Sequence, residues 1–149
     1  NSTERWGVLI FLFFYFRGWQ MLIITNNPMF KNYTDKYDVE FLDTDYIGIL
    51  KKTRDHLHLG YELLTHPLYG SVKPYETIYR TIVIQKANTI SFTSIELIEE
   101  AIETATKFYK INKNIKWTNE ILEDFQVVDK DLIDNTLARM WNCFFTVFW

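Results

Sequence analysis

The sequence predicts a small, single-domain α/β protein, with a mostly parallel sheet of about four strands and three to four helices. Two observations predict this class. Short apolar runs alternate with longer stretches whose apolar residues keep helical spacing. The 149-residue chain shows no internal repeat, low-complexity tract or linker, so residues 21–140 are expected to form one domain.

Four short apolar runs are predicted to be strands, at residues 21–25, 39–42, 61–65 and 81–84. The first ends at Asn26-Asn27-Pro28, a sequence typical of turns. The last is rich in β-branched residues, which favour strands. Because parallel strands end at one edge of a sheet, the loops after the first and third strands are expected to meet if those strands are parallel neighbours.

Helices are predicted between and after these strands. Asp43-Thr44-Asp45 supplies capping oxygens for a helix that Gly60 ends. Thr93 and Glu96 match a capping box at the start of the next helix. Two further helices are expected near residues 119–125 and 130–140.

Charge and cysteine content exclude several classes of protein. The net charge is −3, from 16 basic and 19 acidic residues, and gives no nucleic-acid-binding footprint. Cys143 is the single cysteine, which rules out an internal disulfide and a multi-cysteine zinc site and indicates a reducing compartment, the cytoplasm. His56 and His58 are two positions apart on a predicted helix and do not face each other. We therefore expect no metal and no cofactor.

The two ends of the chain differ from the middle in their aromatic content. Residues 6–16 are largely apolar but too short for a membrane span, and no small-residue cleavage site follows them. We interpret residues 1–20 as translated upstream DNA before a start at Met21; an apolar, membrane-associating N-terminus is the alternative. The aromatic tail at residues 141–149 is either an artefact or the docked end of a helix.

The loop after the third predicted strand is the best candidate for a site. Its candidate ligand-binding residues are His66, Gly70, Ser71, Lys73 and Thr77. His66 is suited to act as a general base or to bind an anion, and otherwise to hydrogen-bond the turn beside Pro67. Gly70, Ser71 and Lys73 have the composition of a phosphate-binding loop without the spacing of a Walker motif.

Asn26 and Asn27, after the first strand, complete the candidate ligand-binding set. Their amides are able to hold a polar ligand, although such residues more often accommodate a turn. If the two loops meet, the set forms one surface at the sheet edge.

Two segments of the chain resemble the GrdX family, whose members are encoded with glycine, sarcosine or betaine reductase systems. These are Thr25-Asn26-Asn27-Pro28 and the stretch from Leu64-Thr65-His66-Pro67-Leu68 to Gly70-Ser71-Val72-Lys73-Pro74. Tyr69 and Ile78 stand where the resemblance leads us to expect a small residue and a proline. The resemblance covers about residues 21–140 and implies an operon association in an amino-acid-fermenting anaerobic bacterium.

The resemblance implies no particular reaction, so two functions stay open. The first is an accessory or regulatory protein that binds a small anionic metabolite or a reductase component. The second is a small enzyme acting on a carboxylated or phosphorylated metabolite, with His66 as general base. We expect binding rather than catalysis, with no nucleic-acid partner and no membrane partner.

Overall fold

The computed structural model describes residues 2–9, 21–34, 37–70, 77–111 and 115–148, with the side chains of residues 141–148 left out. It confirms the α/β class and the four-stranded sheet. The sheet is mixed, with strand order β2-β1-β4-β3, which corrects the prediction of a mostly parallel sheet. The strands are β1 (Met21–Thr25), β2 (Asp38–Phe41), β3 (Tyr61–Leu63) and β4 (Thr81–Lys86).

The direction of β4 explains the correction. β1 pairs in parallel with β2, whereas β4 lies between β1 and β3 and is antiparallel to both. The connection from β3 to β4 runs through the loop that begins at Leu64 and returns the chain in the opposite direction. β1, β2 and β3 therefore all end at the edge of the sheet where β4 begins.

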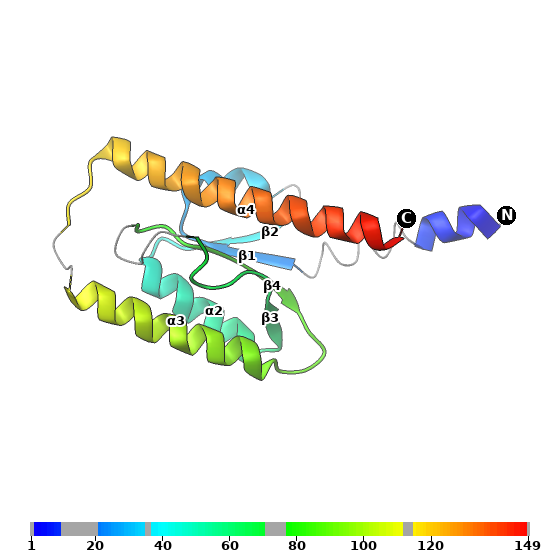
Figure 1. The fold of residues 1–149 in the computed structure, drawn as a ribbon, viewed down its shortest axis with the longest axis horizontal. Helices are drawn as coiled ribbons and strands as arrows, with labels where there is room; N and C mark the ends of the chain where they lie inside the picture. Colours follow the sequence, from blue (N-terminus) through cyan, green and yellow to red (C-terminus); the bar gives the residue numbers. More distant parts are fainter. Residues whose placement is uncertain (1, 10–20, 35–36, 71–76, 112–114, 149) are drawn as a thin grey trace.

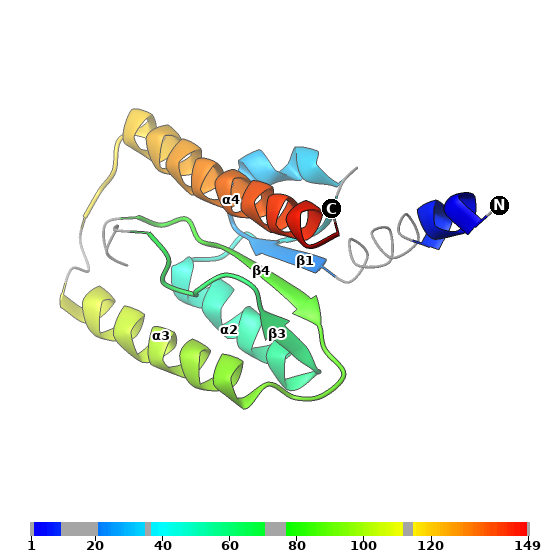
Figure 2. The ribbon, with the colours of Figure 1, turned by 45° about the vertical axis from the view of Figure 1, so that its right-hand side comes forward.

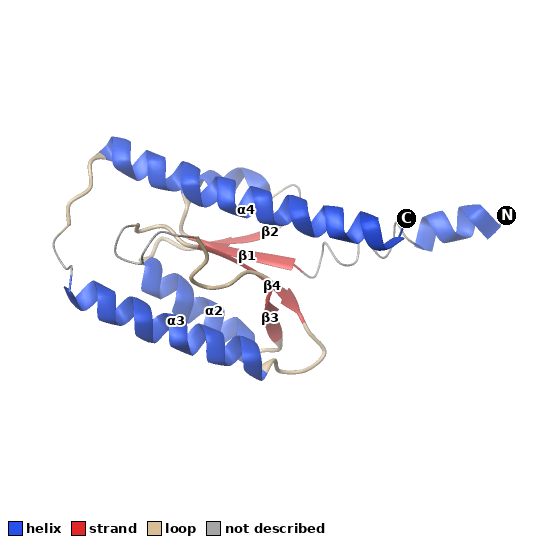
Figure 3. Ribbon diagram, viewed as in Figure 1, coloured by secondary structure: helices blue, strands red, loops and turns tan. Residues whose placement is uncertain are grey.

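Helices cover both faces of the sheet (Figure 1). One face carries α2 (Tyr46–His58) and α3 (Phe92–Ile111), which pack side by side. The other face carries α4 (Asn119–Phe148) and the short 3-10 helix η1 (Pro28–Tyr33). Figures 2 and 3 show the same arrangement, with the sheet as the middle layer.

Alternating residues of the two central strands divide the core between these faces. Ile24 and Ile82 point to the cluster beneath α2 and α3, whereas Ile23 and Val83 join the cluster beneath α4 and η1. All four side chains are fully buried. The continuous apolar runs in the sequence therefore reflect strands covered on both faces.

The helix ends agree with the predictions at α2 and differ at α3. Asp45 caps α2 by accepting a hydrogen bond from the Gly48 amide at 2.7 Å. Gly60 follows its C-terminus with a φ of 98°, a conformation that favours glycine. The predicted Thr93 cap of α3 is wrong. The side chain of Ser91, two residues before Thr93, accepts a hydrogen bond from the Ser94 amide at the start of this helix.

The two C-terminal helices predicted at residues 119–125 and 130–140 form one continuous helix, α4. The intervening Gln126-Val127-Val128-Asp129 contains no glycine or proline to stop it. Together with η1, α2, α3 and a helix over residues 2–9, this gives five helices in the described part of the chain, against the predicted three to four.

Residues 2–9 expose their side chains, and residues 10–20 of the predicted N-terminal extension lie outside the described residues. Among the helices that the structure describes, none has the length and apolar character needed to cross a membrane.

Candidate functional site

The loops after β1 and β3 meet at one edge of the sheet, although their strands are not neighbours. Asn26, directly after β1, donates from Nδ2 to the carbonyl oxygens of Thr44 and Ile78 at 2.9 and 2.8 Å. Its Oδ1 accepts from the backbone N–H of Arg80 at 2.8 Å. Asn26 therefore ties β1 to the segment that enters β4, and its amide group is fully engaged with the protein's own backbone.

Asn27 is also engaged internally. Its Oδ1 accepts from the Met29 amide at 3.1 Å, and this caps η1. Its Nδ2 donates to the carbonyl of Gln126 and to Oδ2 of Asp129, both on α4, at 2.9 and 3.1 Å. Asn27 is completely buried, so it joins β1 to α4 rather than presenting an amide to solvent.

Asp129 connects the two loops from the α4 side. In addition to Asn27, its Oδ1 accepts from the Tyr69 hydroxyl at 2.7 Å, and its Oδ2 accepts from the Thr81 hydroxyl at 2.6 Å. The Thr81 oxygen lies 2.7 Å from that of Thr25 on the adjacent strand. Asp129 is 6% exposed, so one buried carboxylate accepts hydrogen bonds from side chains in three other segments of the chain.

Burial raises the pKa of the Tyr69 phenol well above its usual value, and the charge of Asp129 adds to this shift. The phenol is therefore protonated at neutral pH and available to donate to the carboxylate. A loop residue far from α4 in the sequence is fixed against that helix by this bond.

Arg80 is the central cation of the site. It directly precedes β4 and is only 3% exposed, which is rare for arginine unless it is paired. Its guanidinium carbon lies 4.3 Å from the ring centroid of Tyr69 and 4.8 Å from that of Tyr46. Two aromatic rings therefore stabilise the positive charge of this buried side chain.

The hydrogen-bonding capacity of Arg80 is only partly used. Nη1 donates to the carbonyl of Tyr69 at 3.1 Å, whereas Nε is buried and has no hydrogen-bond partner among the described residues. No described carboxylate lies within 4 Å of the guanidinium. The neighbouring Tyr46 hydroxyl is also buried and has no hydrogen bond within 3.5 Å among the described residues; burial raises its pKa, and the nearby Arg80 guanidinium partly opposes that rise.

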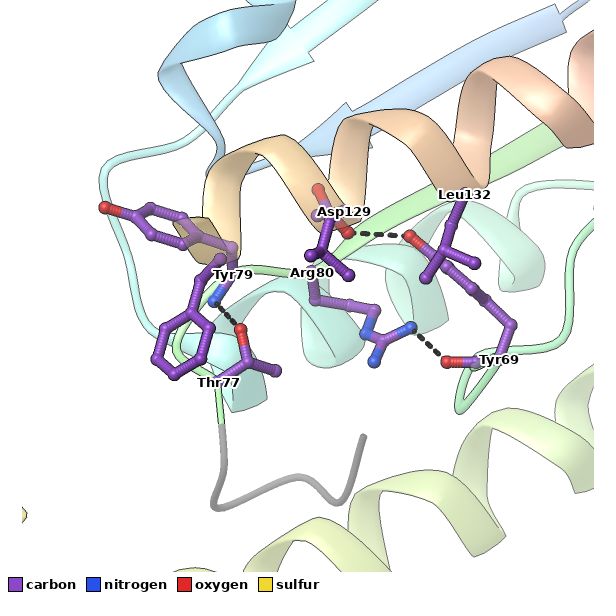
Figure 4. Close-up of a pocket in the computed structure, with 8 residues that line it drawn as sticks. Tyr69, Thr77, Tyr79, Arg80, Asp129 and Leu132 are labelled. Atoms are coloured by element: carbon purple, nitrogen blue, oxygen red, sulfur yellow. Dashed lines mark hydrogen bonds between the residues drawn. The ribbon is translucent and has the colours of Figure 1, made fainter. Parts of the chain in front are cut away.

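A small cavity of about 30 Å³ lies beside these groups (Figure 4). Arg80 and Asp129 are the two charged side chains among the described residues that line it. Apolar side chains of α4 form much of the remaining wall. The described residues of the lining are Tyr69, Thr77, Tyr79, Arg80, Phe125, Val128, Asp129 and Leu132. The arrangement is suited to hold a small polar group against a buried guanidinium.

Of the predicted ligand-binding residues in the loop after β3, the structure places Thr77 at the cavity and His66 away from it. Thr77 lines the cavity, and its Oγ1 accepts from the Tyr79 amide at 3.2 Å. His66 is exposed, lies outside the cavity lining, and accepts from the Leu68 amide at Nδ1 over 3.0 Å. This bond is the turn interaction that the sequence offered as the alternative to a functional role.

Gly70 turns the loop with a φ of 86°. Ser71 and Lys73 lie outside the described residues, so their predicted roles stay predictions.

No group of side chains able to hold a metal ion occurs within the described ranges. His56 lies 2.7 Å from the Glu40 carboxylate through Nε2, so it connects α2 to β2. Its ring also packs edge-on against Tyr61.

Arg80, Asp129 and Tyr46 are the members of this site that the sequence did not reveal. Each lies in or beside a helix or strand, where a single charged or aromatic residue in the sequence looks like an ordinary surface or core residue. The available signal was Arg80 itself, a charge placed immediately before the apolar run of β4. A charged residue entering a buried strand requires a partner or a function.

A comparison with protein-family models gives a match over residues 22–138 to the family described as GrdX-like protein. This range contains β1 except Met21, all of β2 to β4 and most of α4, and therefore every described residue of the cavity. No curated protein and no solved structure matches the chain.

Proposed function

Since this chain belongs to the GrdX-like protein family, we propose that it is an accessory or regulatory protein of glycine reductase systems that binds a small carboxylate at Arg80. Family membership supports the association with those systems. The buried, incompletely bonded guanidinium of Arg80 is the observation that carries the proposal for a ligand.

A buried cation without a paired anion is costly, because it has lost its hydration and gained little in return. The two tyrosine rings offset part of this cost, on the order of 2 kcal/mol for a desolvated cation–π contact. The unpartnered Nε–H adds a further cost of about 1–3 kcal/mol. An anion at the guanidinium would supply both the charge and the acceptor.

A carboxylate suits this position better than a larger anion. Its planar pair of oxygens matches the planar fork of a guanidinium, and such pairs are strong. The cavity is small, and Phe125, Val128 and Leu132 make part of its wall apolar. A carboxylate with a very short carbon chain would place oxygens on Arg80 and carbon against these side chains.

A reductase component is the other partner proposed for this protein, through a carboxylate of its own presented to the same cavity. The single cysteine of the chain supports placing this role in a reducing compartment, the cytoplasm of an anaerobic bacterium. The enzymatic alternative, with His66 as base, gains no support from the geometry, because His66 lies outside the cavity lining.

Binding of acetate by the full chain tests the proposal. Isothermal titration calorimetry should detect saturable binding by the wild type at constant ionic strength. Arg80→Lys keeps the charge but loses the planar fork and Nε, and should raise the Kd by roughly tenfold or more. Arg54→Lys is the matched control, because Arg54 is a half-exposed arginine on α2 that lies 3.5 Å from Glu99; its Kd should be unchanged.

A second measurement does not depend on the folding of a variant. The Nε–H resonance of Arg80 in the wild type should shift on addition of acetate and saturate with the same Kd. If the wild type shows neither heat nor a resonance shift with acetate, the proposed carboxylate site is wrong.

A further inference from the structure

The cavity beside Arg80 also has an anionic wall. Asp129 lines it from α4, is 6% exposed, and is, with Arg80, one of two charged residues in the part of the lining that the structure describes. All three hydrogen bonds that Asp129 accepts come from neutral groups, namely the Asn27 amide and the Tyr69 and Thr81 hydroxyls. No cationic group of the described residues lies within 4 Å of its carboxylate.

Asp129 retains capacity for another donor. A carboxylate offers about four lone-pair positions to hydrogen-bond donors. Oδ2 receives two bonds, from Thr81 and Asn27, whereas Oδ1 receives one, from Tyr69. Among the described residues, one position on Oδ1 is therefore open, and no cation lies within 4 Å of this buried carboxylate.

Tyr69 keeps the two charges of the cavity apart. Its hydroxyl donates to Asp129, and its backbone carbonyl accepts from Arg80, so the charged groups lie at opposite ends of this one residue (Figure 4). The tyrosine ring packs against the guanidinium between these two bonds. A direct ion pair between Arg80 and Asp129 is absent from the described contacts, so both charged groups are available to a ligand.

We propose that the occupant of this cavity is a small zwitterion, with its carboxylate on Arg80 and its cationic nitrogen directed to Oδ1 of Asp129. This deepens the proposed carboxylate site and rests on it. Opposite charges on the ligand would compensate both buried charges of the protein at once, whereas a simple carboxylate would compensate Arg80 and be repelled by Asp129. The small volume of the cavity, about 30 Å³, favours a ligand with only one or two carbons between its charges.

Glycine and glycolate are the probes that separate these cases. They have the same size and the same carboxylate, but glycolate carries a neutral hydroxyl in place of the ammonium group. Titration calorimetry on the full chain near pH 7 should give a Kd for glycine that is at least about fivefold lower than that for glycolate, the effect of one charge-assisted hydrogen bond. Methylammonium, which lacks the carboxylate, should not bind measurably.

Asp129→Asn removes the negative charge and should abolish most of the preference for glycine while glycolate still binds. Asp131→Asn, at an exposed position on the same helix, should preserve the preference. If Asp129→Asn does not fold, the comparison of glycine with glycolate binding by the wild type still tests the zwitterion proposal. Equal affinities for glycine and glycolate would overturn the zwitterion and leave the carboxylate site intact, whereas failure of both glycolate and acetate to bind would overturn the carboxylate site itself.

Discussion

Thr81 at the start of β4 donates a hydrogen bond from Oγ1 to Oδ2 of Asp129 on α4, over 2.6 Å. Thr81 is fully buried, and its oxygen also lies 2.7 Å from that of Thr25 on β1. On this face of the sheet, helix α4 contacts β4 and packs against η1. The Thr81–Asp129 bond is therefore a principal polar attachment between α4 and the sheet.

Asp129→Ala should destabilise the protein strongly. The substitution leaves three donors without an acceptor, on Asn27, Tyr69 and Thr81. Leaving buried donors unpaired costs about 1–3 kcal/mol each when they cannot reach water, and we expect a total loss of roughly 3–5 kcal/mol. Urea denaturation gives the change in the free energy of unfolding. Asp131→Ala, at an exposed position two residues along α4, should change that free energy by less than about 0.5 kcal/mol.

Asn26→Asp should also be destabilising, although the two side chains have nearly the same shape and differ only by an oxygen in place of the NH2 group. Nδ2 of Asn26 donates to two carbonyl oxygens, of Thr44 and Ile78. A carboxylate oxygen in the place of Nδ2 has no hydrogen to donate, so it would face two carbonyl oxygens that are acceptors themselves. We expect a loss of roughly 2–4 kcal/mol near pH 7, because two bonds are lost and a charge is buried.

The exposed Asn32 of η1 provides the control for this change. Differential scanning calorimetry near pH 7 should show a lowered thermal midpoint for Asn26→Asp and an almost unchanged one for Asn32→Asp. A small effect of Asn26→Asp as well would mean that Asn26 does not join β1 to the segment before β4 in solution.

The elements of the fold were largely predictable from local sequence, whereas the sheet pairing was not. Asp45 and Gly60 identify the ends of α2 because capping and left-handed backbone depend on individual residues. The antiparallel direction of β4 depends on how the chain returns after Leu64, and no residue encodes that path locally. A buried run such as Ile82-Val83-Ile84 looks the same in a parallel strand and an antiparallel one.

Of the residues that the sequence singled out for a site, only Thr77 is among the described residues that line the candidate cavity. Asn26 and Asn27 lie at the same edge of the sheet as the cavity, yet both amides bind other parts of the protein. Arg80 and Asp129 are 49 residues apart in the sequence and meet through packing of α4, which periodicity does not reveal. His66 attracted attention because imidazole is versatile, but its Nδ1 accepts a bond from the loop it stands in.

His66→Ala should have little effect on carboxylate binding. His66 is exposed and bonds the Leu68 amide, so its removal should cost about 1 kcal/mol or less in stability. Titration with acetate should return the wild-type Kd. His58→Ala, at an exposed position at the end of α2, is a control for the loss of an imidazole. A large increase in the Kd for His66→Ala, but not for His58→Ala, would contradict this prediction and would indicate that the ligand binds at the His66 loop.

The stability of the protein should fall as the pH rises above about 10, the ordinary pKa of tyrosine. Burial raises the pKa of Tyr69 in the folded protein well above that value, and it also raises those of Tyr46 and Tyr109. Above pH 10 the unfolded chain therefore releases protons that the folded protein still holds, and this favours unfolding. The stabilising contribution of each phenol is complete below pH 10 and is lost progressively toward its raised folded-state pKa.

Tyr69→Phe isolates one part of this dependence. The variant lacks the bond to Asp129 and should be less stable than the wild type at pH 8, by roughly 1–3 kcal/mol. Between pH 9.5 and 11 its free energy of unfolding should fall less steeply, because one fewer buried phenol resists deprotonation. Urea denaturation at closely spaced pH values measures both effects. If the two profiles stay parallel across this range, Tyr69 titrates alike in the folded and unfolded chains, and its buried bond to Asp129 does not persist in solution.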